Sequence, residues 1–354
     1  MSMQHVGRED FLVDSKAYWC RLAALLERRL SPRAAQDGSA NCNRRPTTST
    51  SSTRDFVRGM SLNLQLVKRI PSSDLRRAMR FATVLAAVAA LPQGVFKPLV
   101  SAQSFTSCNP LESTCPPNPA LGRSATFDFT QGVEPQGWSS SSGSITSDRN
   151  NGAALTISGQ GDSPTLQSSF YIMFGRVEFD LRAAPGVGIV SSAVLQSDSL
   201  DEIDWEWLGG DDQQVQSNYF GKGQAAGYNR ARFHSAPGNQ DSFKTYAIDW
   251  TAERIEWQID GATVRTQNAA DASGMFPQTP CYVKVGTWAG GGPGNAAGTV
   301  EWAGGSTDFS RGPFTMYVRS IRVTDYSTGS EYVYSDGTGT WQSIRSIGGQ
   351  VNGH

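Results

Sequence analysis

The sequence has no dominant charge and few histidines, and each shortage excludes a class of function. Its formal net charge is −1, from 31 Lys and Arg against 32 Asp and Glu among 354 residues, and the basic residues are scattered. This balance lacks the basic patch that nucleic acid requires, so we expect no nucleic-acid partner. The three histidines, His5, His234 and His354, are too dispersed in the sequence for a metal site, and we expect no metal and no cofactor.

A long apolar run is also missing. Residues 81–91 form an apolar stretch about half as long as a membrane-spanning helix needs, and Lys97 with two prolines interrupts its continuation. A transmembrane anchor is therefore the weaker alternative. The basic flank at 76–80, the apolar stretch and the small residues that follow it have the layout of a secretory signal peptide. We predict a signal peptide at residues 79–102, and a mature protein that is secreted and has no stable membrane span.

A signal peptide belongs at the N-terminus, whereas this one follows 78 other residues. Residues 1–78 combine a short helical pattern, a Ser/Thr run and scattered basic residues, without a visible compact core. We interpret them as disordered or as an over-extension of the gene, with translation beginning at Met79 or Met60. The mature chain would then begin near Gln103.

Glycine and tryptophan are plentiful, and long amphipathic helical patterns are absent after the signal region. With 37 glycines and nine tryptophans, the composition suits an antiparallel β protein with tight turns. Apolar and polar residues alternate with period two in several segments, of which the clearest are residues 176–182, 246–250 and 254–259. Asp260-Gly261 is a hairpin signal. These short strands predict an all-β fold, a sandwich of two antiparallel sheets of the jelly-roll kind.

The cysteines indicate one small covalent loop. Cys108 and Cys115 enclose a short Pro/Asn-rich stretch, which indicates a loop closed by a disulfide; two unpaired thiols in a flexible segment are the alternative. Cys281 follows Pro280 at the start of an apolar strand, so we expect it to be a buried free thiol.

The acid run Asp201-Glu202-Ile203-Asp204-Trp205-Glu206-Trp207 carries most of the functional information. On a strand, Glu202, Asp204 and Glu206 share one face, while the tryptophans project from the other, where we expect them to lie in the core. Neighbouring acids would lie within about 7 Å of one another, and like charges at that distance cost stability. No Lys or Arg occurs between residues 198 and 222 to neutralise them.

Paired carboxylates suit the chemistry of glycosidic bonds. Retention of configuration needs a nucleophile and an acid/base about 5–5.5 Å apart. The Cα atoms of Glu202 and Glu206 would be about 13 Å apart on a straight strand, so their side chains must lean inward over a bent sheet. Asp204 would hydrogen-bond a neighbour and hold the two pKa values apart. A solvated strand face and a calcium site are the alternatives, and spacing alone leaves them open.

Further stretches add to the acid run: Gln216–Gly223, Ser107–Cys115, Tyr246–Trp250, Gly286–Gly291, Gly298–Gly305 and Gly312–Tyr317. Together they resemble glycoside hydrolase family 16, and specifically the fungal Crh-type cell-wall transglycosylases. The resemblance implies a concanavalin-like β-jelly roll over residues 103–348, whose concave face binds glucan or chitin. It also implies that Glu202 is the nucleophile, Glu206 the acid/base and Asp204 an assisting carboxylate.

Sugar-binding residues can also be proposed. Lys284, Gly286 and Trp288 share a strand face, and the glycine would leave open backbone beside an indole on which a sugar ring can stack. Thr299 and Trp302 match positions that line the cleft of the family. For both tryptophans, burial in the core is the alternative.

The expected protein is a secreted, monomeric, retaining transglycosylase of the fungal cell wall. The resemblance implies that it cleaves chitin and transfers the new end to β-glucan or chitin, with residues 349–354 as a short tail. A hydrolytic endo-β-glucanase and a non-catalytic wall-binding lectin are the alternatives.

Overall fold

The computed structural model describes residues 106–354, except residue 142 and residues 225–229. The predicted disordered segment and the predicted signal peptide lie outside the described residues, so both stay predictions.

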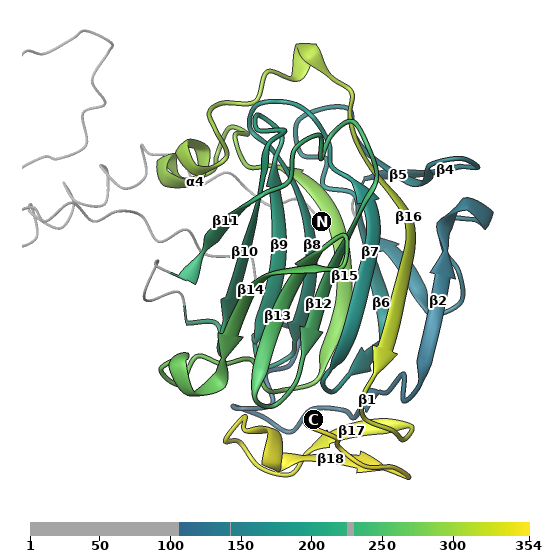
Figure 1. The fold of residues 1–354 in the computed structure, drawn as a ribbon, viewed down its shortest axis with the longest axis vertical. Coiled ribbons are helices and arrows are strands. Elements are labelled where there is room, and N and C mark those ends of the chain that lie inside the picture. The colour runs from purple at the N-terminus through teal and green to yellow at the C-terminus, as the bar shows by residue number, and fades with distance from the viewer. Residues whose placement is uncertain (1–105, 142, 225–229) are drawn as a thin grey trace, which may run out of the picture. The chain divides into compact units, whose positions relative to one another are not determined.

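In the described part of the chain, the strands form two large antiparallel sheets and a small third one (Figure 1). The first large sheet consists, in spatial order, of β11 (Arg232–Ser235), β10 (Gln214–Phe220), β9 (Glu202–Leu208), β8 (Ile189–Ser197), β15 (Cys281–Ala289), β6 (Thr165–Ile172) and β3 (Trp138–Ser141). The second consists of β14 (Ala262–Asn268), β13 (Arg254–Ile259), β12 (Lys244–Trp250), β7 (Gly175–Arg182), β16 (Phe314–Asp325), β5 (Gly152–Ile157) and β4 (Ser144–Asp148), with β2 (Ser124–Asp128) beside β16.

The third sheet consists of β1 (Asn118–Pro119), β17 (Glu331–Tyr334) and β18 (Ile344–Ile347), and lies near the C-terminus at the lower end of the view (Figure 1). One short α-helix, α4 (Ala297–Trp302), follows β15. The Cys108–Cys115 disulfide is present in the structure, and Cys281 is a buried free thiol, as predicted.

Local sequence patterns account for the strands. The three alternating segments form β7, β12 and β13, with their apolar residues buried and their charged residues partly exposed. Asp260 and Gly261 have φ values of 48° and 82° and connect β13 to β14, as expected for a tight hairpin turn. The two-sheet antiparallel sandwich predicted from the sequence is confirmed.

The core lies between the two large sheets. Trp205 and Trp207 are fully buried, as predicted from alternation. The indole N–H of Trp205 donates to the carbonyl of Ala247 on β12, and that of Trp257 on β13 donates to the carbonyl of Asp204 at 3.1 Å. These inter-sheet bonds satisfy buried polar groups and hold β9 against the opposite sheet.

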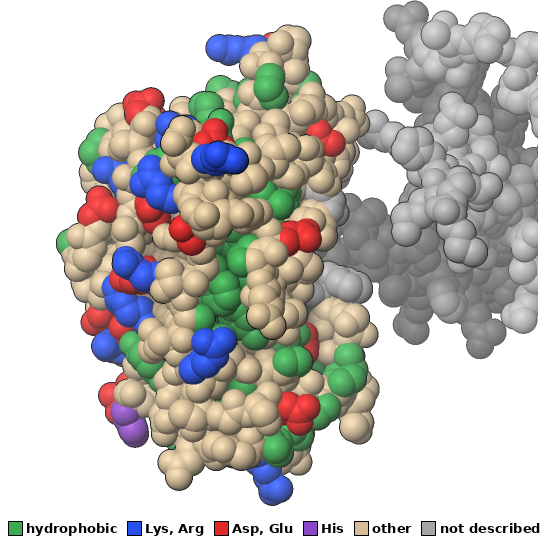
Figure 2. Space-filling view, turned by 90° about the vertical axis from the view of Figure 1, so that its right-hand side faces the viewer, with side chains coloured by type: hydrophobic (Ala, Val, Ile, Leu, Met, Phe, Trp, Pro, Cys, Tyr) green, Lys and Arg blue, Asp and Glu red, His purple; other side chains and the backbone are tan. Residues whose placement is uncertain are grey.

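Charged side chains of both signs are interspersed over the face that Figure 2 shows. On the outer side of the second sheet, Arg176 and Arg322 both pair with Glu178, at 2.9 and 2.8 Å. Burial alone would raise the pKa of Glu178, but these two arginines outweigh it and lower the pKa. The outer face of β7 is therefore a solvated surface on which acidic and basic side chains form ion pairs.

Candidate active site

Strand β9 presents Glu202, Asp204 and Glu206 on the side of the first sheet that faces away from the core. We call this side the acid face. Ile203, Trp205 and Trp207 project into the core and are fully buried, so their packing fixes the strand beneath the acids. Glu202 and Asp204 are little exposed, at 7% and 2%, whereas Glu206 is partly exposed.

Strand pairing determines what surrounds the acids. Residues directly opposite one another in antiparallel strands share a face. The acids therefore have as neighbours Gln196, Val194 and Ser192 on β8, and Phe220, Asn218 and Gln216 on β10. None of these side chains carries a positive charge, so the strands adjacent to β9 do not neutralise it.

The acids shift one another's pKa. Burial raises the pKa of Asp204 well above its usual value, and the charges of Glu206 and Glu202 and a hydrogen bond with Glu202 add to this. Burial and the charge of Glu202 raise the pKa of Glu206 to about 8, although Lys284 opposes the shift. With a pKa of about 8, Glu206 is mostly protonated at neutral pH.

Lys284 supplies the positive charge that the acid run lacks. Its ammonium donates to Gln196 Oε1 at 2.8 Å, and the Tyr282 hydroxyl donates to the same oxygen at 3.0 Å. Burial lowers the pKa of Lys284, while the charges of the three acids act in the opposite direction. The predicted sugar-binding lysine is thus an electrostatic neighbour of the acids.

Asp201 belongs to the acid run in sequence but not to the acid face. It is fully buried and accepts hydrogen bonds from the backbone N–H groups of Lys222 and Gln278 and from Thr279 Oγ1. Burial raises its pKa, against the charge of Lys222 and these hydrogen bonds. Asp201 therefore anchors the start of β9.

The predicted stacking residues form a second group on the same sheet. Trp288 lies on β15 and Trp302 in α4, and their rings stack with centroids 6.2 Å apart and an interplanar angle of 26°. Both are partly exposed, so neither belongs to the core. Thr299 lies in the same helix and is also partly exposed.

The prediction of open backbone at Gly286 was wrong. A Cβ at this position would lie 2.8 Å from Thr165 Oγ1 and 3.1 Å from the carbonyl oxygen of Pro164. The glycine is needed because neighbouring strand β6 approaches closely there, and this space is not free for a sugar.

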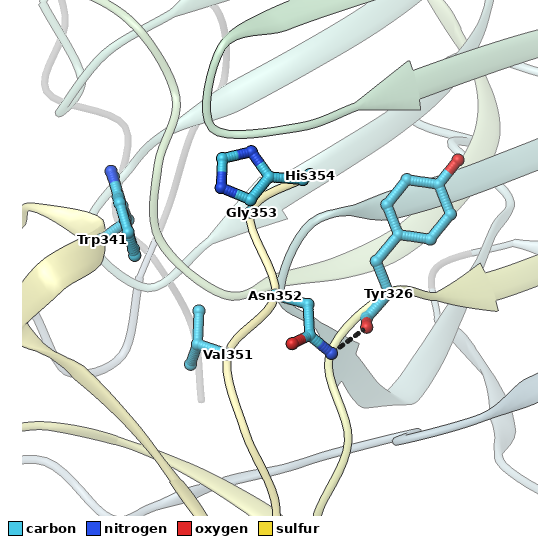
Figure 3. A pocket seen from close by; sticks show the side chains of 6 residues that line it. All are labelled: Tyr326, Trp341, Val351, Asn352, Gly353 and His354. Atoms are coloured by element: carbon cyan, nitrogen blue, oxygen red, sulfur yellow. Dashed lines mark hydrogen bonds between the residues drawn. The ribbon is translucent and has the colours of Figure 1, made fainter.

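A hollow of about 470 Å³ lies near the C-terminus, away from the acid run, and Figure 3 shows the side chains that line it. These are Tyr326, Trp341, Val351, Asn352, Gly353 and His354. The tail is attached to the body, because the amide of Asn352 donates to the carbonyl of Tyr326 at 2.8 Å. None of the acid-face carboxyls lines this hollow, so it is separate from the candidate active site.

Among residues 106–354, without 142 and 225–229, no group of three or more His, Cys, Asp or Glu side chains could hold a metal ion. None of the helices in the same range is both long and apolar enough to cross a membrane.

Sequence reasoning missed Gln196, which accepts from the Lys284 ammonium, and Tyr282, whose hydroxyl donates to the same Gln196 oxygen. The alternation of β8 and β15 could have placed each on one face of its own strand. Only the pairing register, in which Gln196 lies opposite both Glu202 and Tyr282, brings the two faces together.

Chemically, the site combines Glu206, which is mostly protonated at neutral pH, with two further carboxyl groups on the same strand. A pair of carboxyl groups with separated pKa values is what glycosidic-bond cleavage uses. An antiparallel sandwich with such a site fits the class of glycosidases.

Comparison with known proteins identifies the family. The model of glycosyl hydrolases family 16 matches residues 134–304. Crh-like protein 4 of Aspergillus fumigatus is 58% identical over 276 residues, which cover 78% of this chain and 60% of that protein. The Crh-like protein of Arthroderma benhamiae is 57% identical over 253 residues, which cover 72% of this chain and 54% of that protein. The chain thus spans little more than half the length of these relatives.

A solved structure supports the same assignment. The apo Crh5 transglycosylase is 50% identical with a TM-score of 0.65, and the match covers 68% of this chain and 100% of that one. The same transglycosylase in complex with NAG gives a TM-score of 0.66. The chain belongs to glycosyl hydrolases family 16 and, within it, to the Crh-like proteins. Its fold is the β-jelly roll that the sequence predicted.

Proposed function

We propose that this protein is a cell-wall transglycosylase that cleaves chitin with retention of configuration and transfers the new end to β-glucan or chitin. The observation that carries the proposal is the carboxyl set on β9, in which Glu206 has a pKa of about 8 beside Glu202. Membership of the Crh-like proteins supports the reaction class, and the NAG complex of the Crh5 transglycosylase supports a substrate built from N-acetylglucosamine. Family membership also supports an extracellular or cell-wall location.

The first step forms a glycosyl-enzyme. The Glu202 carboxylate attacks the anomeric carbon, while the protonated Glu206 carboxyl gives its proton to the departing glycosidic oxygen. A covalent ester forms, the glycosidic bond breaks, and Glu206 is left as a carboxylate. Asp204 lies between the two glutamates as the assisting carboxyl, and burial raises its pKa well above its usual value.

The second step reverses the proton transfer. The Glu206 carboxylate removes the proton of an acceptor hydroxyl, whose oxygen attacks the anomeric carbon and breaks the ester to Glu202. A sugar hydroxyl gives transfer, whereas water gives hydrolysis. Lys284 opposes the rise in the pKa of Glu206, so it favours the carboxylate form that this step requires.

A labelled-acceptor assay tests the proposal. Chitin oligosaccharides serve as donors, and fluorescent oligosaccharides of chitin or of β-1,3- or β-1,6-glucan serve as acceptors. The proposal predicts labelled products longer than the acceptor, and their loss in Glu202→Gln. Shortened donors without longer labelled products would indicate an endo-hydrolase, and binding without any turnover would indicate a lectin.

A further inference from the structure

Phe233 lies on the acid face although it is two strands away from the acids. The register pairs Glu206 with Gln216 of β10, and Gln216 with Phe233 of β11. Directly opposed residues share a face, so these three side chains project from the same side. The next residue, His234, projects to the core side, where its ring lies 5.8 Å from that of Trp205.

The ring of Phe233 is open to solvent. It is 49% exposed, and in the described part of the chain it is the one aromatic residue among the exposed large hydrophobic side chains. Phe220 lies on the same face, opposite Glu202, but the guanidinium of Arg230 lies 5.0 Å from its ring centroid. A single exposed apolar residue is ordinary on a surface, but on an edge strand it favours unwanted strand pairing. An exposed phenyl ring at this position, in register with Glu206, is therefore more readily explained by a binding role than by chance.

Trp288 and Phe233 flank the acids on opposite sides. Trp288 lies on β15 and Phe233 on β11, so each is two strands away from β9. At about 4.8 Å between strands, each aromatic group lies about 10 Å from the acid strand. Through Val190, Trp288 is in register with Leu208, two residues beyond Glu206 on the same face of β9. A sugar chain that crosses the strands above Glu206 therefore passes close to both aromatic groups. The first side offers two stacked indoles and the second offers one phenyl ring.

In transglycosylation, the two halves of the bound sugar chain need binding sites of different strength. The donor half of the chain stays on the enzyme through both steps, because it is covalently held in between. The other half must dissociate after the first step so that an acceptor can take its place. Strong stacking suits the half that stays, and weaker stacking suits the half that is exchanged.

We propose that Phe233 is the stacking platform for the acceptor, a β-linked oligosaccharide that presents the apolar face of a sugar ring. The stacked pair Trp288 and Trp302 holds the donor half on the other side of the acids. This inference rests on the function proposed above. It adds a binding residue to the acid face. It also orients the sugar chain, with the donor half toward β15 and the acceptor half toward β11.

The test separates the two Michaelis constants. Phe233→Ala is assayed at saturating chitin oligosaccharide with increasing labelled glucan acceptor, and then at saturating acceptor with increasing donor. Loss of one stacking ring is expected to raise the KM for the acceptor roughly two- to tenfold, with the KM for the donor unchanged. The fraction of donor that is hydrolysed rises, because water needs no platform. Phe233→Tyr keeps the ring and is expected to restore the acceptor KM.

Two comparison variants make the test specific. Ile347→Ala removes a side chain of similar exposure, 46%, from β18 of the small sheet, and is expected to leave both constants unchanged. Trp288→Ala is expected to raise the KM for the donor. The inference is overturned if Phe233→Ala leaves the acceptor KM unchanged or raises the donor KM instead. If the unmodified protein forms no longer labelled product at all, the proposed function itself is wrong.

Discussion

Replacement of Glu206 by Gln should stabilise the protein at neutral pH while it removes the proposed acid/base. The pKa of Glu206 is about 8 in the folded chain, against an ordinary value of 4.5. Below pH 4.5 the carboxyl is protonated in both the folded and the unfolded chain and costs no stability. Between pH 4.5 and pH 8 it ionises more readily in the unfolded chain, so its cost to the free energy of folding grows as the pH rises. At 1.36 kcal/mol per pKa unit, complete burial would make this cost at most about 3 kcal/mol at pH 7.

Solvent screening reduces that figure, because Glu206 is partly exposed. We therefore expect Glu206→Gln to gain about 1–2 kcal/mol at pH 7, or about 2–8 °C in Tm for a domain of this size. Thermal melts between pH 4.5 and pH 8 measure this directly. The gain should be small at the acid end and grow with pH.

Glu178→Gln is the matched control, with the opposite sign. Arg176 and Arg322 outweigh burial and lower the pKa of Glu178. Its ionised form therefore contributes stability at neutral pH, and this stability is lost as the pH falls through the folded pKa. This variant should be less stable than the unmodified protein at pH 7 and equally stable in acid. A Glu206→Gln variant that is less stable at pH 7, or whose gain does not depend on pH, would refute the reasoning.

Three other changes give distinct outcomes. Lys284→Met removes the cation that opposes the raised pKa of Glu206, the proposed acid/base, so the alkaline limb of the pH–activity profile should move to higher pH; an unmoved limb would contradict this role. Trp257→Phe and Trp250→Phe each delete a buried indole N–H donor and should each cost about 1–3 kcal/mol of stability. The Trp257 indole donates to Asp204 on the acid strand, whereas that of Trp250 donates to Pro277, so only Trp257→Phe should also lower kcat. Replacing Cys108 and Cys115 together by Ser should lower Tm by several degrees without a change in kcat, because the bond closes a surface loop; unchanged melting would show that the loop contributes nothing.

Local periodicity was sufficient to predict the parts of the site that depend on one strand. Glu202, Asp204 and Glu206 share a face, and Trp205 and Trp207 lie beneath them, because alternation on a strand is a local property. The hairpin at residues 260–261 was predictable for the same reason.

Features that depend on strand pairing could not be predicted. The sequence predicted that Gly286 leaves open space for a sugar, but strand β6 approaches closely there and fills that space. The contact of Lys284 with Gln196 and the register of Phe233 with Glu206 both join segments far apart in sequence. No local pattern specifies which strands become neighbours, and that choice completes the site.

The central claim is that Glu202 forms a covalent bond to the sugar, and trapping that bond tests it most directly. Glu206→Gln would be incubated with a chitin oligosaccharide that carries a good leaving group, which departs without a proton from the acid/base, while the second step slows. Mass spectrometry of the peptide that contains residues 201–207 should then show the sugar attached to Glu202. An intermediate attached to Asp204, or a product of inverted configuration without any adduct, would contradict the account.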